Sequence, residues 1–260
     1  MATKHALLIG INYYKNPANQ LNGCINDVTE MAILLAGLNY KRENIVIMTD
    51  DKTGTSEPTK ANILAQIKAL VGRVKSGDTV FVHYSGHGSQ VRDRNGDELK
   101  NLYTPGMDDC ICPSDFGNYS GSNGFILDDV LKENLVNQIP VGAKLRAFFD
   151  CCHSGSILDL EFIWKLNGIY TKDGAPEKKS DDIIMISGCR DDQTSADAWN
   201  DAKRQAGGAL TMALVQSITP TITWKNLVTA TRKYMAQNGF TQYPLLSVSN
   251  QTLGDKVFDI

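Results

Sequence analysis

Segments with the period of a strand and segments with the period of a helix alternate along the first 150 residues, and this alternation limits the fold more than any other feature. In chain order the expected strands are 5–11, 45–48, 79–84 and 144–149, and the expected helices begin near residues 26, 58 and 127. The assignment rests on short apolar runs for strands and on apolar residues at helical spacing for helices. Such alternation predicts an α/β fold, with a mostly parallel sheet, right-handed crossovers and helices on both faces.

The second half of the chain continues this pattern less regularly. Strands are expected at 183–186 and 245–248, and helices at 207–218 and 223–237, the latter with Thr223 as N-cap. Two polar segments, 88–125 and 165–181, are expected to be irregular. Long structureless segments inside a domain are usually functional or disordered.

Composition places the chain among ordinary globular proteins. It has 260 residues, 42% hydrophobic and 21% charged, with a net charge of −3. This charge argues against a nucleic-acid or membrane-binding surface. The apolar run at 6–11 is too short for a signal sequence or a membrane span, so a soluble cytoplasmic protein is expected. The six cysteines have neither the spacing of a disulfide framework nor that of a zinc site.

Reactive side chains follow two of the expected strands. Asp150-Cys151-Cys152-His153 comes after 144–149, and Ser85-Gly86-His87-Gly88 comes after 79–84. Ligands of open α/β sheets bind beyond the carboxyl ends of the strands, so the two segments are expected to meet. A nucleophilic thiol needs a base within hydrogen-bond reach.

The histidines differ in their suitability as that base. His5 stands at the beginning of the first expected strand, and His83 falls inside the third, where a packing role is expected. His153 is adjacent to Cys152, and neighbouring side chains of an extended segment point to opposite faces. His87 stands between two glycines past a strand end, where backbone can approach a substrate. A Cys152–His87 pair is therefore the working hypothesis.

Two motifs together resemble the metacaspases, cysteine peptidases of the caspase-like fold. They are His83-Tyr84-Ser85-Gly86-His87-Gly88 and Asp150-Cys151-Cys152-His153-Ser154-Gly155. A third matching segment is 187–197, and the similarity runs in family order from about residue 4 to the C-terminus. The resemblance implies a three-layer caspase-like sandwich forming one peptidase domain over 1–260. A large-subunit-like part of about 1–165 would be joined through a linker, 165–181, to a small-subunit-like part of about 182–260.

The resemblance also assigns catalytic roles. Cys152 becomes the nucleophile, His87 the general base, and the reaction passes through a thioester. The backbone N–H groups of Gly88 and Cys152 are expected to hold the oxyanion. Cys151 stands where the family often has serine.

Cleavage after Arg or Lys is implied as well, through an acidic pocket. The matching residues are Asp27, Ser85 and Asp150. A pair of carboxylates would offer a basic side chain charge-assisted hydrogen bonds. Two plainer interpretations remain open: Asp27 as a first-turn residue stabilised by the helix dipole, and Asp150 as a carboxylate that orients a histidine.

Several metacaspases are activated by calcium held by aspartates, and the resemblance predicts the same here. The matching residues are Asp108, Asp128, Asp129 and Asp159, with Asp109 as an alternative to Asp108. Calcium prefers several carboxylate oxygens. The Asp93-x-Asn95-x-Asp97 segment does not complete an EF-hand, because its glycine and closing residue are wrongly placed.

Basic residues in polar segments suggest self-cleavage. They are Lys165, Lys172, Lys178, Lys179, Lys203 and Arg204. Exposed sites in mobile segments are the ones peptidases cut. The metacaspase resemblance also favours a monomer. Two other functions remain open: a catalytically silent scaffold or regulator that keeps the fold, and a thiol transpeptidase that shares the dyad.

Overall fold

The computed structural model describes residues 2–93, 105–165, 167–188, 197–200 and 205–260. Several sequence-based expectations lie outside these ranges. They concern residues 189–196 of the third motif, Lys203, Arg204, and Asn95 and Asp97 of the rejected EF-hand segment.

Within the described ranges, eight strands form one central sheet in the order β2-β1-β3-β7-β10-β13-β8-β9. Five are parallel: β1 (Lys4–Gly10), β2 (Ile45–Thr49), β3 (Thr79–Ser85), β7 (Lys144–Asp150) and β10 (Ile183–Ser187). The other three run antiparallel to their neighbours: β13 (Leu245–Val248), β8 (Phe162–Trp164) and β9 (Tyr170–Lys172). The predicted mostly parallel sheet is therefore confirmed.

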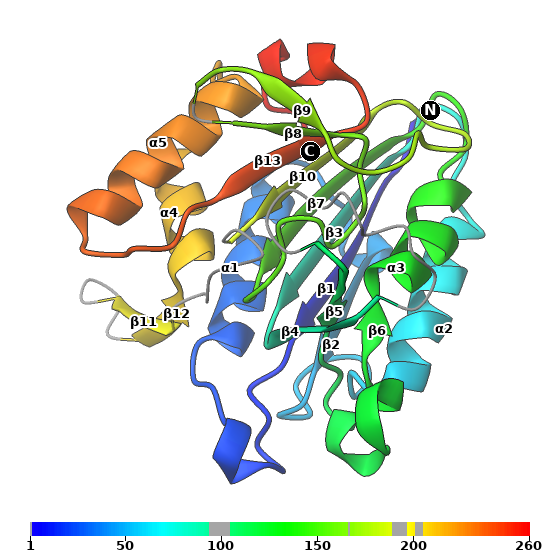
Figure 1. The fold of residues 1–260 in the computed structure, drawn as a ribbon, viewed down its shortest axis with the longest axis vertical. Helices are drawn as coiled ribbons and strands as arrows, with labels where there is room; N and C mark the ends of the chain where they lie inside the picture. The colour runs from blue at the N-terminus through cyan, green and yellow to red at the C-terminus, as the bar shows by residue number, and fades with distance from the viewer. Residues whose placement is uncertain (1, 94–104, 166, 189–196, 201–204) are drawn as a thin grey trace.

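Helices cover both faces of this sheet (Figure 1). The helices α1 (Cys24–Gly37), α4 (Ala209–Ser217) and α5 (Trp224–Gln237) pack on one face, over Ala6 and Leu8 of β1. The helices α2 (Lys60–Val71) and α3 (Asp128–Asn134) pack on the other, over Leu7 and Ile9. Alternate residues of one strand thus enter two separate cores, as the pleat requires. The expected α/β sandwich is confirmed.

The described residues of the segment 88–125, expected to be irregular, instead contribute two strands to a second sheet. The strands β4 (Gly88–Arg92), β5 (Met107–Ile111) and β6 (Ile126–Leu127) pair antiparallel in that order. The expectation was wrong because β5 carries two adjacent aspartates, and Asp and Gly are poor strand formers by propensity. Burial of Cys110 and Ile111 shows that tertiary packing overrides that preference.

The expected linker 165–181 also contains a strand. Its residues Tyr170–Lys172 form β9, which pairs with β8 and extends the main sheet beyond β13. A three-residue strand is too short to give a periodic signal, which explains why the sequence did not reveal it.

The predicted N-cap of α5 is confirmed: the hydroxyl of Thr223 accepts a hydrogen bond from the amide of Asn226 (3.3 Å).

A buried ion pair fixes the C-terminal segment against the sheet. Arg146 on β7 is fully buried, and its guanidinium contacts the carboxylates of Asp259 (2.9 Å) and Asp182 (2.7 Å). We expect Asp259→Ala to lower the free energy of unfolding by about 3 kcal/mol, because it leaves a buried charge undercompensated. Urea unfolding measures this loss.

The control is Asp255→Ala, which removes an exposed carboxylate paired with Lys225 and should cost below about 1 kcal/mol. Burial acts to raise the pKa of Asp259, but Arg146 and Lys144 hold it below its ordinary value. Its contribution is therefore present at neutral pH and is lost as pH falls through that lowered pKa. Equal unfolding midpoints for the two variants at neutral pH would contradict this account.

Candidate active site

The two reactive segments meet at the carboxyl edge of the sheet. The register places Ser85 of β3 opposite Asp150 of β7, so the residues that follow each strand leave the sheet at the same level. The backbone of Gly88 lies directly against the carbonyl of Cys152, and a Cβ at position 88 would overlap that oxygen. Only glycine fits this approach. The structure therefore brings the His87 and Cys152 segments together, as the sequence predicted.

Cys152 is the accessible thiol of this region. The described cysteines form no disulfide, and among them only Cys152 is not buried; they are Cys24, Cys110, Cys112, Cys151 and Cys152. Burial, with a smaller effect of nearby Cys152, raises the pKa of Cys112 to about 12. Cys151 is 1% exposed and packs in the core under α2 and α3. Of the adjacent pair, Cys152 is therefore the accessible thiol, and Cys151 is a core residue.

Hydrogen bonds fix both the backbone and the ring of His87. Its amide donates to the hydroxyl of Tyr13 (2.8 Å), and its carbonyl accepts from the hydroxyl of Tyr84 (2.8 Å). Its Nε2 lies 2.7 Å from the carbonyl oxygen of Asn19. A carbonyl can only accept, so Nε2 carries a proton in this contact, and Nδ1 is the ring nitrogen left to accept one. This tautomer suits a base.

The other three histidines differ in their surroundings. His5 is buried, with Nε2 3.6 Å from Asp78. His83 is fully buried 3.3 Å from the hydroxyl of Thr211, and burial lowers its pKa to about 3, so it is neutral. His153 has φ of 46°, so it is not in an extended segment. The strand-alternation argument against it was wrong, because the chain leaves β7 at Asp150.

The three residues of the expected acidic pocket converge beside this edge. Ser85 donates its hydroxyl hydrogen to Asp27 Oδ2 (2.6 Å), and the amide of Gly208 donates to both oxygens of Asp27 (2.8 and 3.0 Å). Asp150 Oδ2 accepts from the amide and the hydroxyl of Thr211 (2.8 and 2.9 Å). A Cβ at Gly208 would meet carboxylate oxygens of both aspartates. Two buried carboxylates thus face one backbone position.

This geometry bears on the two interpretations left open by the sequence. Asp27 does lie in the first turn of α1, and it is also 1% exposed and hydrogen-bonded to Ser85 and Gly208. The bond that orients the ring of His87 comes from Asn19, and the oxygen of Asp150 described above is engaged by Thr211. The carbonyl of Asn19 is thus the described group that orients the ring of His87.

A second group of carboxylates lies on the three-stranded sheet. Carboxylate oxygens of Asp108 on β5 and of Asp128 and Asp129 at the start of α3 lie within 4.8 Å of one another. Asp108 and Asp128 are each 1% exposed. Three carboxylates this close repel one another unless protons or a cation compensate, and their hard oxygens suit a divalent metal. These residues could therefore hold a metal ion.

The alternative ligand Asp109 faces the other way. Its oxygens accept hydrogen bonds from the side-chain amide of Gln90 (2.9 Å) and from the hydroxyl of Ser156 (3.1 Å). Successive residues of a strand point to opposite faces, which separates Asp109 from Asp108. Asp159 is not a member of the grouped carboxylates; its φ is 44°, and its carbonyl accepts from Lys132.

Several residues that build the site were not found from the sequence. Gly208 and Thr211 position the acidic pair, while Asn19, Tyr13 and Tyr84 position His87. The contact between Asp27 and Gly208 spans 181 positions, so no local pattern reveals it. The one available signal is the Gly207-Gly208 pair directly before a helix, since glycine often marks a close backbone approach.

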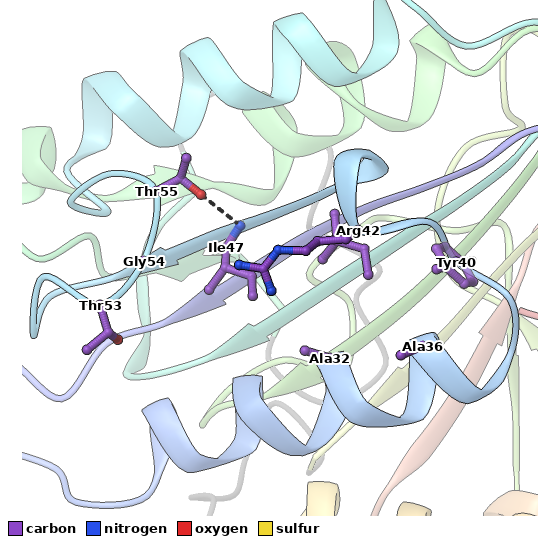
Figure 2. Close-up of a pocket in the computed structure, with 9 residues that line it drawn as sticks. Ala32, Ala36, Tyr40, Arg42, Ile47, Thr53, Gly54 and Thr55 are labelled. Atoms are coloured by element: carbon purple, nitrogen blue, oxygen red, sulfur yellow. Dashed lines mark hydrogen bonds between the residues drawn. The ribbon is translucent and has the colours of Figure 1, made fainter.

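A hollow of about 360 Å³ lies elsewhere, between α1 and the edge strand β2. Figure 2 shows the small side chains of Ala32 and Ala36 opposite Ile47, with Arg42 beside them. None of the predicted site residues lines it. It is therefore separate from the carboxyl edge where Cys152 lies.

Comparisons with known proteins agree with the geometry. The sequence model described as "Metacaspase, peptidase C14 domain" matches residues 4–161. The chain is similar to Metacaspase-2 of Trypanosoma brucei brucei, with 38% identity over 276 aligned positions covering 99% of this chain and 76% of that protein. It is also similar to Metacaspase-1A of Aspergillus oryzae, with 36% identity covering 98% and 70%.

A solved structure supports the fold alone. A protein from Geobacter sulfurreducens superimposes with a TM-score of 0.67 at 21% identity, covering 99% of this chain and 100% of that one. The fold and the sequence together define a cysteine peptidase of caspase-like architecture. The chain belongs to the metacaspase family, peptidase family C14. It therefore acts on proteins. No helix among the described residues has the length and hydropathy to cross a membrane.

Proposed function

We propose that this peptidase cleaves proteins after Arg or Lys, with Cys152 as nucleophile and His87 as its base. The observation that carries the proposal is the convergence of Asp27 and Asp150 on Gly208, next to the strand end that bears Cys152. A guanidinium or ammonium group reaching this pair gains charge-assisted hydrogen bonds. A pocket for an acidic side chain would need cations there instead.

The reaction follows from the placement of the two residues. His87 Nδ1 takes the proton of the Cys152 thiol, and the thiolate attacks the scissile carbonyl. The backbone N–H groups of Gly88 and Cys152 stabilise the oxyanion. The imidazolium then protonates the leaving amine. Water, deprotonated by the same ring, hydrolyses the thioester and restores the thiol.

We further propose that the grouped carboxylates Asp108, Asp128 and Asp129 bind Ca²⁺, with Asp159 as a fourth ligand. When bound, calcium would neutralise the mutual repulsion of these groups. Asp109 lies next to Asp108 and bonds Ser156, four residues after Cys152. Ordering β5 would therefore also order the loop that carries the nucleophile.

The test is hydrolysis of matched fluorogenic peptides with Arg or Asp before the cut, each with calcium and with a chelator. We expect turnover of the Arg peptide with calcium and none of the Asp peptide. Turnover of the Asp peptide alone would contradict the basic pocket, and full activity in the chelator would contradict calcium activation. No turnover at all would favour a silent scaffold. A product joined to an added amine would indicate a transpeptidase.

The calcium site has its own predicted variant. Asp128→Asn should abolish calcium-dependent activity, because it removes one of the carboxylate charges that attract the ion. Calcium should raise the melting temperature of the unmodified protein and leave that of Asp128→Asn unchanged. Asp181→Asn, the same change at an exposed site, is the control and should behave as the unmodified protein. An equal calcium-induced rise in Asp128→Asn would rule out this site.

Self-cleavage and a monomeric state belong to the same proposal. Lys178 and Lys179 are exposed in a segment without helix or strand, which is the conformation a peptidase can bind. Lys172 is exposed on β9. The β8–β9 hairpin occupies the side of the sheet beyond β13, so a second copy cannot pair there with β13. Mass spectrometry after calcium addition and light scattering would test the two points.

A further inference from the structure

We infer that Tyr13 is a positioning residue for His87 and that Asp50 holds Tyr13 in the required conformation. This inference rests on the proposed role of His87 as the base. The tyrosine belongs to the loop after β1, and the aspartate directly follows β2. Both lie at the carboxyl edge of the sheet, because β1 and β2 are parallel neighbours.

The backbone of Tyr13 has an unusual conformation. Its φ is 57°, in the left-handed region that residues with a side chain rarely adopt. Such a conformation is unfavourable in itself and persists only where the surroundings enforce it. Asp50 supplies that enforcement: Oδ1 accepts from the amide of Asn12 (2.9 Å) and Oδ2 from the amide of Tyr14 (3.1 Å). One carboxylate thus holds the residues on both sides of Tyr13.

In this conformation the side chain of Tyr13 contacts His87. The residue is 1% exposed, and its hydroxyl donates to the carbonyl of Cys112 (2.7 Å) while it accepts from the His87 amide (2.8 Å). Its ring lies 4.6 Å from the imidazole, centroid to centroid. Burial raises the pKa of Tyr13 well above its ordinary value, so the hydroxyl keeps its proton.

A second buried tyrosine completes the arrangement. Tyr84 donates its hydroxyl hydrogen to the His87 carbonyl (2.8 Å), and its oxygen lies 3.2 Å from that of Tyr13. The amide and the carbonyl of His87 are therefore each bound to a tyrosine hydroxyl. The only described contact of the ring nitrogens is that of Nε2 with Asn19. The position of Nδ1 relative to Cys152 therefore depends on the backbone of His87. Because Tyr13 helps to fix that backbone, it also affects the position of Nδ1.

The test is Tyr13→Phe, which keeps the ring and removes only the hydroxyl. We expect kcat for an Arg peptide to fall roughly 10-fold with KM within about twofold, since misplacing a catalytic group by ~1 Å costs up to ~100-fold. The rate of alkylation of Cys152 by iodoacetamide near neutral pH should fall. The acidic limb of the pH profile of kcat should also shift. Asp50→Asn should show the same pattern more weakly, because an amide offers only one acceptor oxygen.

Two controls distinguish a failure of this inference from a failure of the proposed function. Tyr119→Phe makes the same change at an exposed tyrosine and should leave all these quantities unchanged. His87→Ala tests the proposed base itself: if that variant kept its activity, the proposed function would fail. If His87→Ala is inactive while Tyr13→Phe keeps the original kcat, alkylation rate and pH profile, the proposed function stands and this inference is wrong. Should Tyr13→Phe not fold, Asp50→Asn provides the comparison, because it loosens the backbone on both sides of Tyr13 and keeps the tyrosine hydroxyl.

Discussion

Replacing Cys152 with Ala should abolish hydrolysis of an Arg peptide, whereas Cys151→Ala should keep most of it. Cys152 lies partly exposed beside the His87 segment, and Cys151 is buried in the core. Loss of a covalent nucleophile typically lowers kcat by ~10⁴-fold or more. Initial rates at saturating peptide measure both effects.

The buried position of Cys151 defines the control for this comparison. Its truncation leaves a small cavity, so Cys151→Ala should lower the melting temperature somewhat while the folded protein stays active. Cys152→Ala should melt close to the unmodified protein and still be inactive. If Cys151→Ala were inactive although folded, and Cys152→Ala active, the assignment of the nucleophile would be reversed.

Asp27→Asn should lower kcat/KM for an Arg peptide by about 10²–10³-fold, since removing one partner of a buried charge pair costs 2–5 kcal/mol. The change keeps the size of the side chain, and the remaining amide oxygen can still accept from Gly208 or Ser85. A peptide with citrulline in place of Arg carries no charge at that position, so Asp27→Asn should lower its kcat/KM much less. The ratio of kcat/KM for the two peptides therefore isolates the charge.

Glu30→Gln is the matched control, because it neutralises a carboxylate one turn further along α1, outside the proposed pocket. It should leave the Arg-to-citrulline ratio unchanged. An unchanged ratio in Asp27→Asn would show that this aspartate does not contact the basic side chain. Asp150 would then be the remaining carboxylate of the proposed pocket, and the assignment of the Cys152–His87 pair would be unaffected.

The sequence predicted those parts of the fold that depend on local apolar pattern. The parallel strands were predicted because each is a short apolar run, which is typical of strands covered on both faces. They are β1, β2, β3, β7 and β10. The same reasoning placed His87 and Cys152 at one edge, since carboxyl ends of parallel strands meet. The strands β5 and β9 were missed because one carries adjacent aspartates and the other has only three residues.

The supporting contacts of the site could not be read from the sequence for a different reason. Gly208 and Thr211 reach Asp27 and Asp150 from segments more than 60 residues away. Tyr13 was unremarkable among the polar residues of its loop, and its left-handed backbone becomes visible only in three dimensions. The residue types that do chemistry were recognisable, whereas those that hold them in place were defined by the fold.

The central claim is that Cys152 attacks peptides whose basic residue binds the nearby acidic pair. Its most direct measurement is covalent labelling by a peptidyl-arginyl chloromethyl ketone with calcium, followed by peptide mapping. The account predicts one adduct per chain on Cys152, absent with the aspartyl analogue and blocked by excess Arg peptide. An adduct on Cys151, or equal labelling by the aspartyl analogue, would contradict it.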